Sequence, residues 1–183
     1  MNTPQTLDRD GIAALIPHGG AMCLLARLEA WDRQRIVCVA TNHRDADHPL
    51  RTRSGLLAPC AIEYAAQAMA LHGALIGRAA GMPATPGYLA SARGVRLHVL
   101  RLDDLTLEGL VAVVAAVAAD AADAADVADR CAGRARDELR IEATRQAGDA
   151  RQILYAFTVS HAGRPIADGR AAVVLNTLLA ASP

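Results

Sequence analysis

"APCAIEYAAQAMALHGAL", residues 58 to 75, is an apolar, alanine-rich stretch with one carboxylate, Glu63, near its start. This composition predicts a buried helix over about residues 59 to 78, because alanine favours helix and Pro59 suits the first turn. An ionised Glu in such a helix costs several kcal/mol unless it is paired, and otherwise the carboxyl takes up a proton. Glu63 is therefore either a neutral carboxylic acid suited to general acid catalysis or a structural anchor paired with an arginine.

Shorter elements are expected before this helix. A short helix over residues 11 to 16, capped by Asp8 or Asp10, is followed by strand patterns at residues 22 to 31 and 35 to 43. The second pattern has a β-branched core, and the first is also compatible with helix. We interpret the pair as a β-hairpin.

More strands are expected after the helix. Residues 88 to 100 have a strand pattern in which Gly94 marks a bulge. Three further strand patterns lie at residues 138 to 145, 151 to 163 and 164 to 176. The sum is an α+β fold, in which one long central helix is wrapped by a curved, mostly antiparallel sheet of about six strands.

A low-complexity segment separates these two groups of strands. Residues 111 to 129 are rich in alanine, with Asp at every third position from 120 to 129. That spacing drifts around a helix and does not hold one face. An acidic metal-binding or partner-binding surface is one interpretation, and an inserted, solvated helix or flexible loop is the other. We favour the insertion, because carboxylates that do not converge bind cations poorly.

Length and charge limit the classes of function. The chain has 183 residues, which fits one domain with a sizeable core. Its 19 basic and 19 acidic side chains give a formal net charge of zero, so we expect neither nucleic acid nor an anionic membrane as a partner.

Cysteine spacing and the first residues bear on metals and location. The four cysteines are far apart and form no C-x-x-C pair, so we expect neither a zinc site nor a disulfide framework. "MNTPQTLDRDG" has no basic segment followed by an apolar core, and no apolar run reaches the length that spans a bilayer. A cytoplasmic protein is expected.

Several side chains are candidates for chemistry. Glu63 and Gln67 are spaced i, i+4 and share one side of the predicted helix. His43 and His48 flank the acidic "RDAD" in the loop at residues 44 to 57, where a histidine near its ordinary pKa can act as a base or simply be solvated. His18, in "IPHGG", is a third candidate, and a histidine in that context more often fixes a turn.

Other catalytic patterns are missing from the sequence. There is no G-x-S-x-G, glycine-rich phosphate loop or H-E-x-x-H, which disfavours a serine hydrolase, a nucleotide-binding enzyme and a zinc protease. Cys60 lies one turn before Glu63, where a helix start can acidify a thiol. We interpret it as a small residue of the cavity wall.

"LIPHGGAMCLLARLEAWD" and "HPLRTRSGLLAPCAIEYAAQAMALHG" together resemble the 3-hydroxyacyl-acyl carrier protein dehydratases of the hotdog fold, the FabZ and FabA type. The ApeP-like branch is the most similar. "LIPH" matches the segment before the first strand, and "IEYAAQAMA" places Glu63 on the acid and Gln67 on the glutamine of the central helix. The resemblance covers residues 11 to 106 and 137 to 176, which makes about residues 107 to 136 an insertion in a single hotdog domain.

The resemblance also implies the site. The family's base is a histidine in a "G-H-F-P-G" turn, which this chain replaces with "DADHPLR". The base therefore maps onto His48, fifteen residues before Glu63, with His43 and His18 as alternatives. In hotdog dimers two sheets join edge to edge, and the histidine and the acid of one site come from different subunits.

These roles imply dehydration of a 3-hydroxyacyl thioester, carried by acyl carrier protein or coenzyme A, to the trans-2-enoyl thioester. Substrate-binding residues are expected at the helix start, where a backbone N–H near Ala58, Pro59 or Cys60 could polarise the carbonyl, and at Gln67. No metal or redox cofactor is implied, because the pantetheine arm belongs to the substrate.

Three interpretations stay open at this stage. The chain is a dehydratase of fatty acid or aryl polyene synthesis, active as a homodimer or higher homo-oligomer. Alternatively, Glu63 alone serves a hotdog acyl thioesterase. In the third, the altered histidine loop marks a non-catalytic partner in a heterodimer with a related dehydratase.

Overall fold

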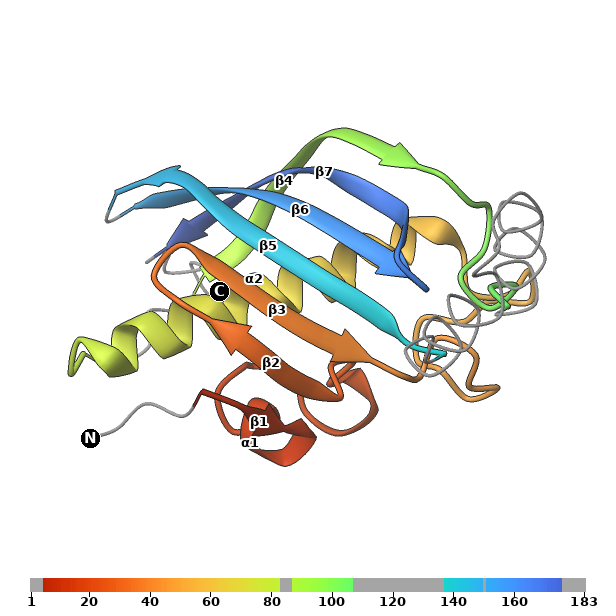
Figure 1. Cartoon of the computed structure of the whole chain (residues 1–183), viewed down its shortest axis with the longest axis horizontal. Coiled ribbons are helices and arrows are strands. Elements are labelled where there is room, and N and C mark those ends of the chain that lie inside the picture. Colours follow the sequence, from red (N-terminus) through yellow and green to blue (C-terminus); the bar gives the residue numbers. More distant parts are fainter. Residues whose placement is uncertain (1–4, 83–86, 107–136, 150, 176–183) are drawn as a thin grey trace, which may run out of the picture.

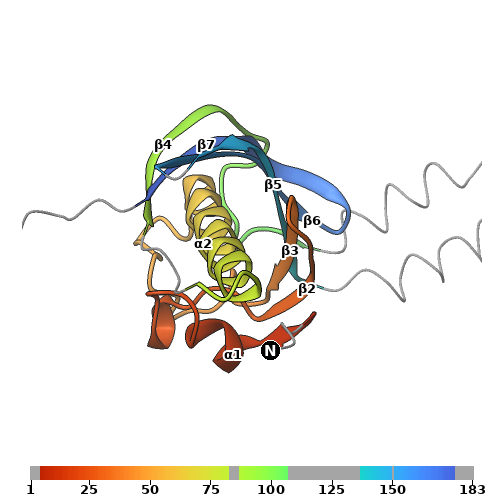
Figure 2. The same cartoon turned by 90° about the vertical axis from the view of Figure 1, so that its left-hand side faces the viewer.

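The long helix α2 (Ala61–Ala79) lies within the curve of an antiparallel sheet, as predicted (Figures 1 and 2). The structure is a computed structural model that describes residues 5–82, 87–106, 137–149 and 151–175. The predicted insertion at residues 107 to 136 lies outside the described residues. The α+β class predicted from the sequence is confirmed.

Both ends of α2 follow from local sequence. The helix is entered through a 3-10 turn, η2 (Ala58–Cys60), in which Pro59 occupies a first-turn position. It ends where Gly81 adopts a φ of +68°, and the N–H groups of Gly81 and Met82 donate to the carbonyls of Arg78 and Gly77. This is the Schellman arrangement, which satisfies the last carbonyls of a helix.

The sheet has seven strands in the order β1-β2-β3-β5-β6-β7-β4, and each neighbouring pair is antiparallel. The strands are β1 (Leu7–Asp8), β2 (Arg27–Trp31), β3 (Arg35–Ala40), β4 (Gly87–Leu97), β5 (Leu139–Gly148), β6 (Gln152–His161) and β7 (Arg164–Leu175). Among the described residues, the one strand that the sequence did not predict is the two-residue β1, which pairs with β2 at one edge.

The predicted strand at residues 22 to 31 is wrong over its first half. The structure has a 3-10 turn, η1 (Gly20–Met22), and then irregular chain up to β2. Leu24 N–H donates to the side-chain oxygen of Gln67 at 2.9 Å, so this segment bonds to α2 where a strand would bond to β3. Leu24 and Leu25 are nonetheless buried, which explains why their pattern resembled a strand.

Two local predictions are confirmed. Asp8 caps the short helix α1 (Arg9–Ala13), because its carboxylate accepts from the N–H of Gly11 at 2.9 Å. This helix begins two residues earlier and ends three residues earlier than the one predicted over residues 11 to 16. The register of β4 against β7 shifts between Arg93 and Arg96, around Gly94, whose φ is +58°. This is the predicted bulge.

The core lies between α2 and the concave face of the sheet. Tyr64, Leu71 and Leu75 of α2 are fully buried there. His72 is also buried, with its ring nitrogens 3.0 Å from Tyr155 Oη and 2.7 Å from the Asp32 carbonyl oxygen. It therefore faces away from Glu63, as its spacing predicted. None of the described helices is both long and apolar enough to cross a membrane.

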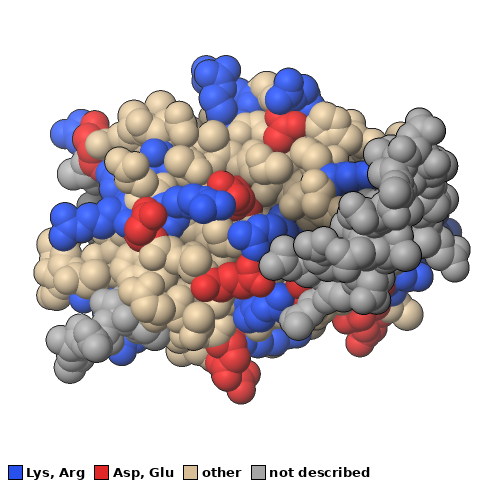
Figure 3. All heavy atoms as spheres, viewed as in Figure 1, with Lys and Arg blue, Asp and Glu red and all other residues tan. Residues whose placement is uncertain are grey.

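Charges of both signs are interspersed over the outer face of the sheet (Figure 3). Arg35 of β3 and Glu142 of β5 form a two-pronged ion pair with distances of 2.7 and 2.6 Å. Arg27 of β2 pairs with both Glu29 and Glu138. The described part of this face therefore carries no field of a single sign, in keeping with the neutral net charge of the chain.

Candidate active site

A cavity of about 560 Å³ lies between one face of α2 and the end of the sheet formed by β4, β6 and β7. Its volume is in the range of pockets that hold small molecules or acyl chains. Small residues of α2 form one wall, namely Ala66, Ala70, Gly73 and Ala74. The opposite wall is mainly apolar, with side chains that include Leu89, Ile153 and Val173. The polar side chains His18 and Glu63 line the same cavity.

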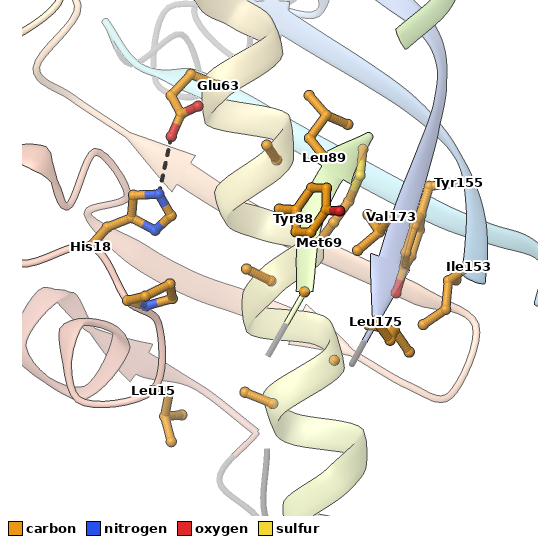
Figure 4. A pocket seen from close by; sticks show the side chains of 16 residues that line it. Leu15, His18, Glu63, Met69, Tyr88, Leu89, Ile153, Tyr155, Val173 and Leu175 are labelled. Atoms are coloured by element: carbon orange, nitrogen blue, oxygen red, sulfur yellow. Dashed lines mark ion pairs between the residues drawn. The ribbon is translucent and has the colours of Figure 1, made fainter. Parts of the chain in front are cut away.

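Glu63 is held from two directions at this cavity. Its Oε1 lies 3.3 Å from Nε2 of His18 and accepts a hydrogen bond of 3.0 Å from Nε2 of Gln67. The side chains of Glu63 and His18 are 33% and 28% exposed, so both are reachable from the cavity. Figure 4 shows this pair on one side of α2 and Tyr155, Ile153 and Leu175 on the other.

Gln67 positions the carboxylate and also anchors the chain opposite it. Its side chain is fully buried. The amide nitrogen donates to the carbonyl of Met22 at 2.8 Å as well as to Glu63, and the amide oxygen accepts from Leu24. The structure thus places the predicted substrate-binding residue Gln67 behind Glu63, where it fixes the orientation of the carboxylate.

His18 comes from the loop between α1 and η1, beside Pro17 and Gly19. Its Nδ1 is buried without a hydrogen-bond partner in the described part of the chain, and its Nε2 faces Glu63. The sequence predicted that this ring would fix a turn through a hydrogen bond. Among the described residues no such bond forms, and the ring faces the carboxylate instead.

His48 lies elsewhere, in a buried hydrogen-bonded chain. Its Nδ1 accepts from the N–H of Leu50 at 3.1 Å, so the proton of the neutral ring is on Nε2, which is 2.9 Å from Tyr64 Oη. That hydroxyl donates to Asn42 Oδ1 at 2.8 Å. Burial lowers the pKa of His48. Within one chain, His48 has both ring nitrogens engaged and does not line the cavity.

His43, the third predicted alternative, is also away from Glu63. Its ring is fully buried beside Asp137 and His161. Burial lowers the pKa of His43, although the nearby carboxylate of Asp137 opposes this shift. Within one chain, the structure therefore brings Glu63 together with His18 and not with His43 or His48.

The helix start does not offer the free N–H groups that the sequence suggested. The N–H of Ala58 donates to the carbonyl of Leu100, and that of Cys60 donates to Leu57, both at 3.0 Å. Pro59 has no N–H. Burial raises the pKa of the Cys60 thiol, so this cysteine is not an acidified nucleophile. These residues close the end of the helix, and we do not assign the binding of a substrate carbonyl to them.

Two features of this region could not be found by reading the sequence. The His18–Glu63 contact joins a loop near the N-terminus to the first turn of α2, and the carboxylate is oriented by Gln67 through a segment that does not form a strand. No sequence motif indicates that His48, Tyr64 and Asn42 are joined by hydrogen bonds.

Comparison with known proteins now identifies the family. A family model described as ApeP-like, ApeP dehydratase, matches residues 11–120. The chain belongs to the ApeP-like dehydratase family. Among solved structures, a chain of the dehydratase heterocomplex ApeI:P from Xenorhabdus doucetiae has a TM-score of 0.68 at 19% identity, over 94% of this chain and 93% of that chain.

A second solved structure, a proposed thioesterase from Silicibacter sp. TM1040, has a TM-score of 0.51 at 11% identity, with 96% of each chain covered. No curated protein sequence matches the chain significantly. At these identities the structural similarities establish the fold, and they confirm that this ApeP-like protein has the hotdog fold predicted from its sequence.

Proposed function

We propose that this ApeP-like protein dehydrates a 3-hydroxyacyl thioester to the trans-2-enoyl thioester, with Glu63 and His18 as the acid and base. The observation that carries the proposal is the 3.3 Å contact between His18 Nε2 and Glu63 Oε1 at the wall of an otherwise mainly apolar cavity. The acyl chain would occupy that cavity, along the small residues of α2.

The geometry suits a reaction at two adjacent carbons. His18 takes the proton from C2, the electron pair forms the C2–C3 double bond, and Glu63 gives its proton to the hydroxyl leaving C3 as water. Adjacent carbons are about 1.5 Å apart, so two groups separated by about 3 Å can serve them at the same time. Gln67 donates to Oε1 of Glu63, so in this proposal the second carboxyl oxygen carries the proton that is transferred.

The thioester is carried by acyl carrier protein or coenzyme A in this proposal, and its pantetheine arm enters with the substrate. Fatty acid and polyene-type lipid synthesis both supply 3-hydroxyacyl thioesters of this class. The required protons move between the substrate, His18 and Glu63, so the mechanism uses no metal or redox cofactor.

A kinetic comparison tests the acid and the base. Glu63→Gln keeps the shape of the side chain but cannot donate a proton as an acid does, and His18→Ala removes the proposed base. Each variant should lose at least about 100-fold in kcat/KM for enoyl formation, since a positioned acid or base contributes about 10²- to 10⁴-fold. Thermal melting should change little in either.

The matched control is Cys60→Ser, because Cys60 lies one turn before Glu63 and does not line the cavity. It should retain most activity. Release of free thiol without enoyl formation would show that the protein is a thioesterase and not a dehydratase. If Glu63→Gln has a much lower melting temperature but unchanged activity per folded molecule, Glu63 is a structural anchor and not the acid.

A non-catalytic partner subunit is the second candidate. It is favoured by one observation, that a solved structure with the same fold is a dehydratase heterocomplex. It is also supported by the replacement of the family's "G-H-F-P-G" turn with "DADHPLR". If the pure protein is inactive and activity appears only with a second dehydratase subunit, unaffected by Glu63→Gln, this candidate is the correct one.

A further inference from the structure

Three side chains from separate parts of the chain converge at the opposite end of the sheet from the cavity's apolar wall. His43 follows β3, Asp137 precedes β5, and His161 ends β6. Among the described residues they form the one group of three His, Cys, Asp or Glu side chains whose donor atoms all lie within 4.8 Å of one another. Their strands are neighbours in the sheet, with Leu139 opposite both Ala40 and His161.

The distances within this group match those between the ligands of a small tetrahedral ion. Oδ1 of Asp137 is 3.3 Å from Nε2 of His43 and 3.0 Å from Nε2 of His161. Two atoms that each lie about 2.0–2.1 Å from Zn²⁺ at the tetrahedral angle are about 3.3 Å apart. All three donor atoms lie within 4.8 Å of one another, so one ion can be placed among them.

His43 provides an independent observation that points to a ligand. Its ring is fully buried, and neither ring nitrogen makes a hydrogen bond in the described part of the chain, although Nε2 lies 3.3 Å from Oδ1 of Asp137. A buried polar atom without a hydrogen bond is unfavourable and calls for an explanation such as a bound ion or water. The Nε2 atom is directed at Asp137, so an ion placed between them would satisfy it.

The positive charge of Arg44 lies on one side of the Asp137 carboxylate and leaves the other carboxylate oxygen available to bind an ion. Arg44 donates to Oδ2 of Asp137 at 2.8 Å, whereas both histidines approach Oδ1. An outer hydrogen bond of this kind orients a metal-binding carboxylate. Because the Asp137 side chain is 36% exposed, a water molecule can reach the fourth position.

We propose that His43, Asp137 and His161 bind one divalent transition-metal ion such as Zn²⁺, which joins the ends of β3, β5 and β6. Two imidazoles and one carboxylate suit Zn²⁺, whereas Mg²⁺ and Ca²⁺ prefer sets of oxygen ligands. The cysteine spacing gave no indication of this site, because no cysteine takes part. The site is separate from Glu63 and does not depend on the proposed dehydratase activity.

Zinc titration of the chelator-treated full chain, followed by calorimetry, tests the proposal. We expect one Zn²⁺ per chain and a higher melting temperature with Zn²⁺, because an ion that binds only the folded state stabilises it. His161→Gln and Asp137→Asn should each weaken zinc binding by at least about 100-fold, more than outer hydrogen-bond partners contribute. Co²⁺ should give the visible absorption bands of a tetrahedral site.

The control variant is His98→Gln. His98 also contacts a carboxylate, Asp168, at 2.7 Å, but it lies on the exposed surface and outside the converging group. Its zinc binding should equal that of the parent. Asp137→Asn keeps the test valid if a histidine variant fails to fold, since this side chain is partly exposed. No stoichiometric zinc binding, or equal binding by the parent and Asp137→Asn, would overturn the proposal and leave an ion-pair cluster.

Discussion

Gln67 illustrates how one side chain can determine the geometry of the proposed site. Its amide makes contacts of 2.8 to 3.0 Å with Met22, Leu24 and Glu63. Because the side chain is fully buried, losing any of these bonds would leave a polar group unsatisfied. The orientation of Glu63 is therefore coupled to the irregular segment before β2.

Asp103 has a comparable structural role in the chain that precedes α2. Its carboxylate receives hydrogen bonds from Arg101 at 3.1 and 2.8 Å and from the N–H of Leu56 at 3.1 Å, and it pairs with Arg51 at 2.8 Å. The hydrogen bonds from Arg101 are the main cause of a lowered pKa, to about 2. This carboxylate joins the loop before α2 to the chain after β4.

The lowered pKa of Asp103 predicts an acid dependence of stability. A carboxyl group with a depressed folded-state pKa stabilises the fold above its unfolded pKa of about 3.9, and this contribution is lost as the pH falls toward 2. Asp103→Asn should lower the free energy of unfolding by about 1–2 kcal/mol at pH 7, with the difference from the parent shrinking between about pH 4 and pH 2. Urea unfolding across this pH range measures it.

Asp104→Asn provides the matched control for this prediction. Its side chain is 65% exposed and pairs with the same Arg101 at 3.2 Å. Neutralising an exposed pair of this kind changes stability by less than about 1 kcal/mol. An Asp103→Asn loss that stays constant down to pH 2 would show that packing or geometry, not charge, causes it.

At the scale of elements, α2 combines two different faces. One face carries large side chains such as Tyr64 and Leu71 into the core, and the other carries small ones along the cavity. Gly73 lies on the cavity side, and a Cβ added there would meet no atom within 4 Å. The absence of side-chain volume at this position therefore leaves room in the cavity.

Substitutions at Gly73 test whether this cavity holds the acyl chain. Gly73→Ala should raise the free energy of unfolding by about 0.5–1 kcal/mol, because glycine is unfavourable within a helix and the added methyl meets free space. Gly73→Leu should fill the cavity and lower kcat/KM for long acyl chains relative to short ones by about tenfold or more. Each methylene that no longer fits costs about 0.8 kcal/mol.

The two variants serve as controls for each other, since Gly73→Ala changes helix propensity with little change in volume. The measurement is a comparison of acyl chains of increasing length with both variants. Equal losses for short and long chains in Gly73→Leu would place the acyl chain elsewhere.

At the scale of the whole molecule, the curved sheet ends in two edge strands. β1 has only two residues, whereas β4 at the other edge has eleven and is largely exposed. A long edge with unpaired backbone groups is suited to pairing with another chain. β4 is therefore the edge through which we expect the proposed edge-to-edge dimer to form.

Mixed oligomers distinguish a site within one chain from a site shared between chains. If Glu63 works with His18 of its own chain, mixing His18→Ala and Glu63→Gln protomers should restore no activity, because neither chain has both groups. If His48 of the opposite protomer is the base, mixing His48→Ala with Glu63→Gln should restore up to about one intact site per mixed dimer.

We expect no recovery in the His18 mixture, with subunit exchange demonstrated by tagged chains. Because His48→Ala keeps both Glu63 and His18, it should be active alone, and its mixture with Glu63→Gln should show no more activity than the separate protomers contribute. His48→Ala should lower the melting temperature, because the N–H of Leu50 loses its partner and Tyr64 Oη keeps only its bond to Asn42. If His48→Ala is inactive alone and its mixture with Glu63→Gln is active, the site is shared between chains and His48 is the base.

The sequence alone determined the central helix and most of the sheet, and it singled out Glu63 as a candidate. These depend on local composition and period: alanine with Pro59 for the helix, alternation for β5 to β7, and a carboxylate within an apolar run. The family motifs on the same stretches led to the hotdog fold for the same reason, since they are contiguous in the chain.

Only the tertiary structure decided which histidine meets Glu63. His18, His43 and His48 all precede α2, and spacing along an irregular loop does not determine where a ring lies. Their positions depend on long-range hydrogen bonds: Gln67 holds the segment that follows His18, Tyr64 engages His48, and Asp137 and His161 surround His43. Such contacts form between parts of the chain that only the completed fold brings together.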